Sequence, residues 1–195
     1  MARVGLSGER LARAGAELAD EVGFDQVTVS ALARRFGVQV ASLYSHVRNS
    51  DDLKVRIATV ALTELADQAA AAVAGRAGRD ALVALGDVYR SYATTHPGRY
   101  TASRYAPPTS VLGAEFVAAG KRHSELMRAV LRGYDLDEPA ATDAVRLLGS
   151  VFHGYVTLEL SGSFSYSEPS SGASWPRILD AIDSLLRTWP ERHSS

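Results

Sequence analysis

The stretch from Thr28 to Asn49 constrains the fold more than any other part of this chain. Apolar residues recur there at helical spacing and predict a first short helix with one buried face, formed by Val29, Leu32, Ala33 and Phe36. Thr28 is placed to cap this helix, and Gly37 directly follows it as a residue that readily adopts the left-handed conformation. A second short helix is predicted over about 39–47, with Val40, Leu43 and Val47 facing inward. Two helices joined by so short a turn form a helix-turn-helix.

The charge of this stretch favours a nucleic-acid partner. No Asp or Glu occurs between Gln26 and Ser50, whereas the segment carries Arg34, Arg35 and Arg48. An acid-free, locally cationic segment suits a phosphate backbone, and a helix-turn-helix places its second helix in a DNA major groove. The alternative is a solvated helical hairpin with surface arginines. The turn, the cap and the polar side chains of the second helix favour DNA.

The sequence TVSALARRFGVQVASLYSHVRNSDDL resembles the DNA-binding domain of TetR-family transcriptional regulators. The matching features are Gly37-Val38, Leu43-Tyr44, His46-Val47 and the segment 49–53 that enters the next helix. The resemblance is specific over about 45 residues and weaker over the rest of the chain. It implies a dimer that binds a double-stranded DNA operator and responds to a small-molecule effector.

The resemblance also implies a set of DNA-facing residues. The positions that match Tyr44 and His46 touch phosphate in the family, and Thr28 is both a cap and a phosphate contact. Gln39 suits adenine, and Val40 or Ala41 suits a thymine methyl group. The full predicted DNA-binding set is Thr28, Ser30, Gln39, Val40, Ala41, Ser42, Tyr44, His46, Arg48 and Ser50. At Ser50 the family often has Lys, so one phosphate contact is lost there.

Composition narrows the remaining possibilities. The chain has 195 residues, 46% hydrophobic residues and a net charge of −1, so any nucleic-acid contact has to come from a local patch. The absence of cysteine excludes disulfides and thiolate metal sites and is natural in a reducing cytoplasm. No uncharged apolar run reaches the roughly 18 residues of a membrane span. No signal-peptide pattern is seen at the start, so we expect a cytoplasmic protein without a membrane partner.

The remainder of the chain predicts more helices and no strands. Helices are predicted from Ser50 as a cap, over about 79–95, from Thr109 as a cap to about 132, over 137–160, and from about Trp175 to 189. The predicted fold is therefore all-α with about nine helices. We expect a helix-turn-helix DNA-binding domain over 1–50 and a helical ligand-binding and dimerisation domain over 51–195. The helix from Ser50 joins the two and is the obvious transmission element.

A small-molecule pocket is expected in the larger domain if the resemblance holds. Aromatic, histidine and methionine side chains fall on inward faces of its helices, and the predicted ligand-binding set is Tyr89, Tyr92, Phe116, His123, Met127, Phe152 and His153. A packed core explains each of them individually. Two short motifs, 96–98 (His-Pro-Gly) and 152–154 (Phe-His-Gly), resemble a Trp-His-Gly subgroup of the family, although Trp is usual where Phe152 stands.

The apolar faces of the last two long helices predict a contact with a second copy of the chain. The predicted dimer interface consists of Phe152, Tyr155, Val156, Ile178, Ile182, Leu185 and Leu186, because two apolar helices from each subunit build a four-helix interface. The alternative is that these helices cover only their own core.

The sequence thus predicts a ligand-responsive transcriptional regulator, most simply a repressor released by its effector. The rival prediction is a helical ligand-binding or scaffold protein that does not bind DNA. Catalysis finds no support, because no G-x-S-x-G, H-E-x-x-H or cysteine nucleophile occurs. The five histidines show no metal-ligand spacing, so neither a metal nor a cofactor is expected.

Overall fold

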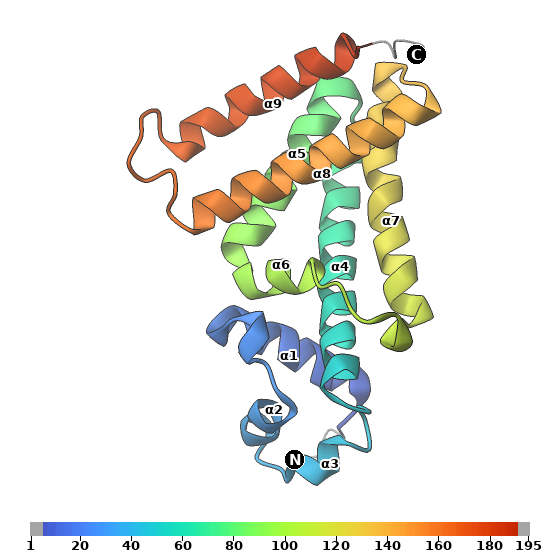
Figure 1. Cartoon of the computed structure of the whole chain (residues 1–195), viewed down its shortest axis with the longest axis vertical. Coiled ribbons are helices and arrows are strands. Elements are labelled where there is room, and N and C mark those ends of the chain that lie inside the picture. Colours follow the sequence, from blue (N-terminus) through green and yellow to red (C-terminus); the bar gives the residue numbers. More distant parts are fainter. Residues whose placement is uncertain (1–5, 191–195) are drawn as a thin grey trace. The chain divides into compact units, whose positions relative to one another are not determined.

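The computed structural model describes residues 6–190, and within them the chain is helical without any strand (Figure 1). The α-helices are α1 (Gly8–Val22), α2 (Val29–Phe36), α3 (Val40–Leu43), α4 (Ser50–Val73), α5 (Gly78–Thr95), α6 (Pro97–Ser103), α7 (Ala114–Leu131), α8 (Glu138–Leu160) and α9 (Ser171–Arg187). Short 3₁₀ helices occupy Phe24–Gln26, Thr109–Val111 and Arg132–Tyr134. The all-α prediction with about nine helices is confirmed.

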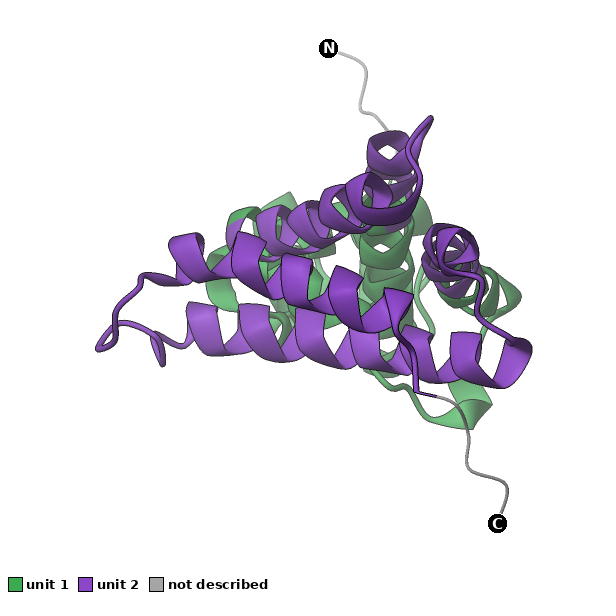
Figure 2. Cartoon of the chain, turned by 90° about the horizontal axis from the view of Figure 1, so that it is seen from above, with its two compact units in different colours: residues 1–65, 95–121 green, residues 66–94, 122–195 purple. Residues whose placement is uncertain are grey.

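The chain divides into two compact units, which do not follow the sequence in single blocks (Figure 2). Unit 1 comprises residues 1–65 and 95–121, and unit 2 comprises 66–94 and 122–195. Helix α6 and the first residues of α7 thus belong with the N-terminal helices. Helix α4 contributes residues to both units.

Unit 1 has one continuous apolar core. Ser7 caps α1 by accepting a hydrogen bond from the backbone N–H of Arg10 at 3.2 Å. Leu11 of α1, Leu32 of α2 and Leu43 of α3 are fully buried in this core. Helix α4 adds the buried Leu53, Ile57 and Ala61, and α6 adds Ala102. The N-terminal helices are therefore packed on the start of α4 and on α6 rather than closed by themselves.

Polar side chains in unit 2 cap α8 and link it to α5. Asp137 caps α8 by accepting from the Ala140 N–H at 2.8 Å, at the start of the helix predicted over 137–160. Arg90 of α5 binds both carboxylate oxygens of Glu159 on α8, at 2.8 and 2.6 Å. This hydrogen bond lowers the pKa of Glu159, outweighing the opposing effect of burial.

Three predicted helix starts are wrong. Asn49, and not Ser50, caps α4, because its side-chain oxygen accepts from the Asp52 N–H at 2.8 Å. Thr109 begins a 3₁₀ turn, and α7 starts only at Ala114. Helix α9 starts at Ser171, one turn before the predicted Trp175, because Ser170 supplies the cap. The first error comes from a choice between two adjacent residues that can both cap a helix.

Across residues 6–190, no helix combines the length and the apolar character that a membrane crossing requires.

Candidate nucleic-acid interface

The turn between α2 and α3 has the geometry that the sequence predicts. Thr28 Oγ1 accepts from the Ala31 N–H at 3.1 Å and so caps α2. Gly37 adopts φ 65° and ψ 34°, the left-handed conformation that costs other residues strain. The Val38 N–H then donates to the Ala33 carbonyl at 3.0 Å and closes the turn. The helix-turn-helix is therefore formed by local hydrogen bonds.

The second helix of the motif is shorter than predicted. Helix α3 spans Val40–Leu43, and Tyr44 to His46 continue as a turn. Near its C-terminal end, the Ser45 hydroxyl donates to the Ser42 carbonyl at 2.8 Å. Side chains that bond nearby backbone compete with helix extension. Leu43 and Val47 are buried as predicted, whereas Val40 is only half-buried.

Eight of the ten predicted DNA-facing residues are exposed. Tyr44 is 52% exposed, although it is a large aromatic residue beside a core. Val40 and His46 are half-buried, and the others are exposed, namely Thr28, Ser30, Gln39, Ala41, Ser42, Arg48 and Ser50. The arrangement presents hydroxyl, amide, phenol, imidazole and guanidinium groups to one possible partner. These groups can donate to phosphate oxygens or to base edges.

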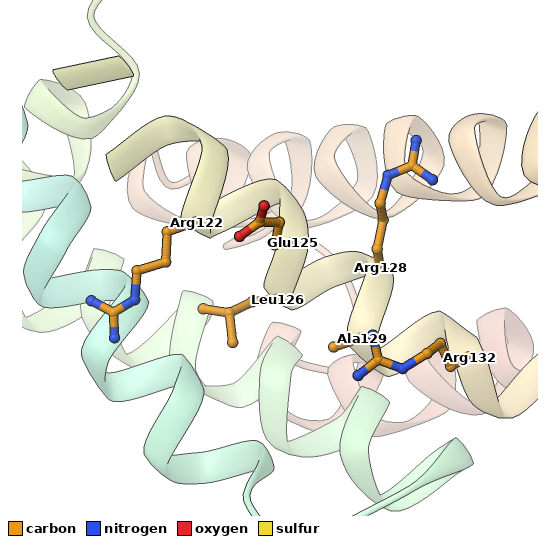
Figure 3. Close-up of a pocket in the computed structure, with 6 residues that line it drawn as sticks. All are labelled: Arg122, Glu125, Leu126, Arg128, Ala129 and Arg132. Carbon is orange, nitrogen blue, oxygen red and sulfur yellow. The ribbon is translucent and has the colours of Figure 1, made fainter. Parts of the chain in front are cut away.

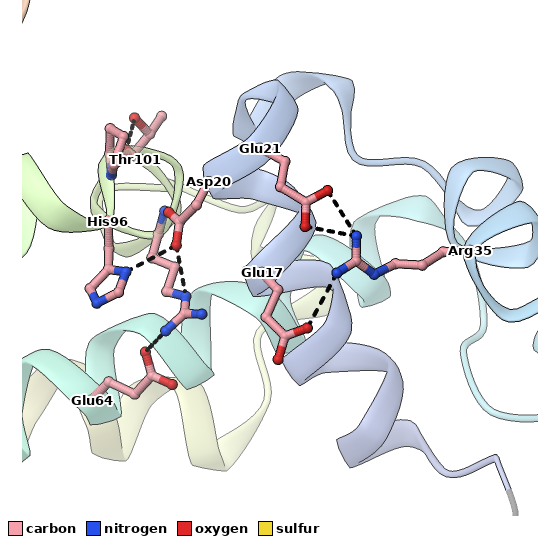
Figure 4. A network of polar contacts seen from close by, with 9 residues as sticks. Glu17, Asp20, Glu21, Arg35, Glu64, His96 and Thr101 are labelled. Atoms are coloured by element: carbon pink, nitrogen blue, oxygen red, sulfur yellow. Dashed lines mark hydrogen bonds and ion pairs between the residues drawn. The ribbon is translucent and has the colours of Figure 1, made fainter.

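The two neighbouring arginines of α2 have different surroundings. Arg35 donates to both carboxylate oxygens of Glu21, at 2.8 and 2.9 Å, and approaches Glu17 at 3.5 Å (Figure 4). Arg34 is exposed, and no side-chain partner for it is found among residues 6–190. Arg35 therefore links α2 to α1 by ion pairs, whereas the exposed Arg34 guanidinium is accessible to a negatively charged partner.

Arg48 is bound by the buried carboxylate of Asp52. From the sequence, Asp52 is recognisable only as an acidic residue in the first turn of a helix. Asp52 is 4% exposed. It accepts from the Arg48 backbone N–H at 3.0 Å, from the Arg48 guanidinium at 3.2 Å and from Arg56 at 3.1 Å. Burial acts to raise the pKa of Asp52, but these hydrogen bonds outweigh it and hold the pKa below its usual value. The Arg48 side chain remains 74% exposed, so the anchored charge stays accessible.

Most predicted ligand residues of unit 2 lie in or near an aromatic cluster. Tyr89 packs against His123 and against Phe152 with ring centroids 5.2 Å apart in both cases, and its hydroxyl hydrogen-bonds His123 Nε2. Phe152 in turn packs on Trp175 at 5.8 Å. Tyr92 and Met127 are also buried, whereas His153 is half-buried. Phe116 is half-buried in unit 1.

Trp175 is the member of this cluster that sequence reasoning missed. It is 2% exposed, packs on Tyr155 at 4.8 Å and donates its indole N–H to Asp87 at 2.9 Å. The signal available in the sequence was its position at helical spacing from Leu179 and Ile182.

The predicted dimer residues are mostly buried within the protomer. Five of them are between 0% and 8% exposed, namely Phe152, Tyr155, Val156, Ile182 and Leu186. Leu185 is 39% exposed and Ile178 is half-buried. The apolar surface that remains on α8 and α9 is shifted from the predicted one, and it includes the 45% exposed Leu158.

A hollow of about 490 Å³ lies along α7 in unit 2 (Figure 3). It is lined by Arg122, Glu125, Leu126, Arg128, Ala129 and Arg132. Arg122 pairs with Asp67 at 2.6 Å and Arg128 with Glu138 at 2.9 Å, so two of its three arginines already have acidic partners. None of the predicted ligand residues lines it. No group of three potential metal ligands comes together in the part of the chain that is described.

Two family models match the chain. A model described as bacterial regulatory proteins, tetR family, matches residues 11–55. A second, described as tetracyclin repressor-like, C-terminal domain, matches residues 82–182. The first match spans the helix-turn-helix, and both descriptions concern regulators.

Relatives and solved structures agree with these matches. An uncharacterized HTH-type transcriptional regulator of Mycobacterium tuberculosis, Rv0681, is 35% identical over 160 residues, which are 80% of this chain and 72% of that protein. The uncharacterized HTH-type transcriptional regulator YobS of Bacillus subtilis is 27% identical and covers 96% of this chain and 92% of its own length. Among solved structures, a TetR from Acinetobacter baumannii AYE in complex with minocycline has a TM-score of 0.71 at 20% identity, covering 96% of this chain and 100% of that one.

Proposed function

This chain belongs to the TetR family of bacterial regulatory proteins, and we propose that it is a ligand-responsive repressor that binds a palindromic operator as a homodimer. The observation that carries the proposal is the exposed polar face of the helix-turn-helix, from Thr28 to Ser50, around the left-handed Gly37. In this proposal residues 1–50 bind DNA, residues 51–195 bind the effector and the second subunit, and the protein acts in the cytoplasm.

On DNA, the predicted residues divide into two roles. Thr28, Tyr44, His46 and Arg48 bind phosphate, because they carry donors at the edge of the motif. The Thr28 oxygen accepts within its cap, so its hydroxyl hydrogen remains free to donate to a phosphate oxygen. Base edges are then left to Gln39 and to the small side chains 40–42, which tolerate close approach to the groove floor.

The dimer contact is formed by the faces of α8 and α9 that the protomer leaves uncovered. Leu158 is the most exposed large apolar residue of α8, at 45%, and Leu185 is that of α9, at 39%. Leu147, Val151 and Ile178 are half-buried and fall on the same helical faces by spacing. A symmetric pairing of two subunits through these faces buries apolar side chains that are exposed in the protomer. Residues that are already buried in the protomer cannot contribute to such a contact.

The effector is proposed to bind at the aromatic cluster of unit 2. Tyr89, His123 and Phe152 combine aromatic faces with a phenol and an imidazole, which suits a partly apolar ligand with a few polar groups. These side chains contact one another in the structure, so a ligand has to replace some of those contacts. A TetR of the same fold has been solved in complex with minocycline, which supports a small molecule as the class of effector.

Release from DNA is proposed to be a population shift. Helix α4 runs without interruption from Ser50 to Val73 and contributes residues to both units, so it is a continuous mechanical link. An effector that favours a conformer with a tilted α4 changes the spacing of the two recognition helices. A hundredfold loss of operator affinity requires only about 2.7 kcal/mol of coupling.

The proposal is tested by selecting bound duplexes from a random DNA pool at two salt concentrations. Enrichment of a palindrome, with a steep loss of affinity at the higher salt, is the expected result. Failure to enrich any sequence, with weak or no binding, would instead favour a helical ligand-binding or scaffold protein.

A further inference from the structure

Asp52 holds two arginines at the start of α4, and only one of them, Arg48, has a role in the proposed function. Oδ1 of Asp52 accepts from Arg48 Nη2 at 3.2 Å, and Oδ2 accepts from Arg56 Nε at 3.1 Å. The carboxylate is itself fixed, because the Arg48 backbone N–H donates to Oδ2 at 3.0 Å and Asn49 accepts the Asp52 N–H at 2.8 Å. Arg56 is therefore a second fixed cation next to a predicted DNA contact.

The two guanidinium groups keep most of their donors. Each has five N–H groups, and the Asp52 carboxylate takes one from each. Among residues 6–190 no other acceptor is found for either side chain. The Arg48 side chain is 74% exposed and that of Arg56 is 41% exposed, whereas the side chain of Asp52 is only 6% exposed. Together they carry one net positive charge with the cations outermost, which suits an anion.

Arg56 lies beside the recognition turn as well as beside Asp52. A Cβ atom on Gly8 would lie 2.9 Å from Arg56 Nη1 and 3.3 Å from the carbonyl oxygen of His46. Both atoms approach the same point at the start of α1, so the guanidinium of Arg56 lies close to His46. His46 is a predicted phosphate contact, and all of these residues belong to unit 1. A DNA backbone that contacts His46 and Arg48 is thus within reach of Arg56.

We propose that Arg48 and Arg56 together bind DNA phosphate, with Asp52 as the positioning residue that holds both guanidinium groups. We call these three residues the arginine clamp. The inference rests on the proposed function and adds to it a DNA contact from the second turn of α4. The bonds to the buried carboxylate restrict both long side chains before DNA arrives, so less conformational entropy is lost when they bind phosphate.

A carboxylate close to DNA has two opposite effects, and the clamp specifies which one dominates. By its charge alone Asp52 repels phosphate, so its removal would strengthen binding. As a positioning residue it strengthens binding, because without it the two arginine side chains move independently of each other. The sign of the change in affinity on removing the Asp52 charge therefore separates the two effects.

Two single variants and their combination test the clamp in the full-length protein, on the duplex that the wild type selects. Asp52→Asn removes the carboxylate charge with little change of shape, and Arg56→Gln removes the second guanidinium. Asp51→Asn is the control for the first variant, since it makes the same change of charge at the neighbouring, exposed position. Arg122→Gln is the control for the second, because Arg122 is also paired with an aspartate, is 45% exposed and lies in unit 2. Affinity is measured over a range of salt concentrations, and circular dichroism monitors folding.

We expect Asp52→Asn to bind about tenfold more weakly than Asp51→Asn, although both variants lose one negative charge. We expect Arg56→Gln to bind about tenfold more weakly than Arg122→Gln, and its dependence of log affinity on log salt to fall by about one unit. In the double variant, loss of Arg56 should reduce affinity much less than it does in the wild type, because Arg56 is no longer held in place.

Three results would overturn the clamp. The first is Asp52→Asn binding as tightly as Asp51→Asn or more tightly, the second is the same salt dependence for Arg56→Gln and Arg122→Gln, and the third is purely additive losses in the double variant. If Asp52→Asn does not fold, the salt dependence of Arg56→Gln decides alone. A wild type that selects no duplex refutes the proposed function and the clamp with it. A wild type that selects a duplex, with Arg56→Gln binding it like the wild type, refutes only the clamp.

Discussion

Tyr44 in the helix-turn-helix and Tyr89 in α5 are both predicted binding residues, yet their surroundings differ. Tyr44 is 52% exposed, and its neighbours Ser42 and Arg48 are exposed as well. Tyr89 is 2% exposed, packs against two rings and hydrogen-bonds His123. The first side chain is available to a partner without rearrangement, whereas the second already serves the protomer.

The comparison teaches how each site has to work. DNA binding at the exposed helix-turn-helix requires no loss of internal contacts, so new contacts and the release of counterions both favour it. In the proposed function, a ligand at the aromatic cluster would exchange internal contacts for ligand contacts, so its binding would change the packing of α5, α7 and α8. In this proposal the cluster therefore serves switching, whereas the exposed helix-turn-helix serves the reading of sequence.

The largest expected effect is on the cluster. Phe152→Ala removes a fully buried ring between Tyr89 and Trp175, so we expect a loss of about 3–5 kcal/mol in the free energy of unfolding. Urea denaturation measures it. A loss below about 1 kcal/mol would show that the cluster is loosely packed and would weaken the contrast with the helix-turn-helix.

The next effect concerns the dimer face. Leu185→Glu places an unpaired carboxylate in the proposed contact, where burying it costs several kcal/mol, so we expect monomers by analytical ultracentrifugation. Leu112→Glu is the control, since Leu112 is similarly exposed at 42% but lies in unit 1. Ile182→Glu is unsuitable for this purpose, because Ile182 is buried in the protomer and its substitution unfolds the core. A Leu185→Glu protein that stays dimeric would place the interface elsewhere.

A smaller effect is expected at the recognition turn. Tyr44→Phe combined with His46→Ala removes two donors to phosphate, so operator binding should weaken by about 1.5–3 kcal/mol while stability stays unchanged. Fluorescence anisotropy gives the affinity, and thermal melting gives the stability. Tyr166→Phe, at a residue that is 97% exposed in unit 2, is the control for loss of a surface phenol. Unchanged affinity in the double variant would remove these two residues from the interface.

The smallest effect separates two adjacent arginines. Arg34→Gln should reduce the dependence of log affinity on log salt by about one unit, because an unpaired charge near the turn releases a counterion on binding. Arg35→Gln should leave that dependence nearly unchanged, since its charge is bound to Glu21 and Glu17. Affinities measured over a range of salt concentrations give both slopes. Equal slopes for the two variants would show that the ion pairs of Arg35 open when DNA binds.

Local patterns in the sequence are sufficient to predict the fold. Gly37, the Thr28 cap and the spacing of Leu32 and Phe36 act within a few residues, so the amino-acid sequence by itself locates the helix-turn-helix. The helix predicted over 137–160 is located by local contacts as well, because Asp137 caps it. Asn49 and Ser50 are adjacent residues that can both cap a helix. The Asn49 side chain accepts the Asp52 N–H, so the predicted cap is wrong by one residue.

The sites are less predictable because their contacts join distant parts of the chain. Helical spacing marks Tyr89 and Phe152 as inward, but it does not distinguish a core residue from a pocket residue. Asp20 accepts the Arg99 backbone N–H across a large sequence separation, and neither residue belongs to a periodic pattern. In the sequence, residues 96–98 stand out only as a family-like motif, since their packing on Ala19 is visible only in the folded chain.

The most direct test of a dimeric, sequence-specific regulator is a hydroxyl-radical footprint of the protein on the duplex that it selects. Two symmetric patches of protected backbone, about one helical turn or a whole multiple apart, are predicted for a dimer that presents two helix-turn-helix faces. A single protected patch, or uniform weak protection along the duplex, would contradict that mode of binding.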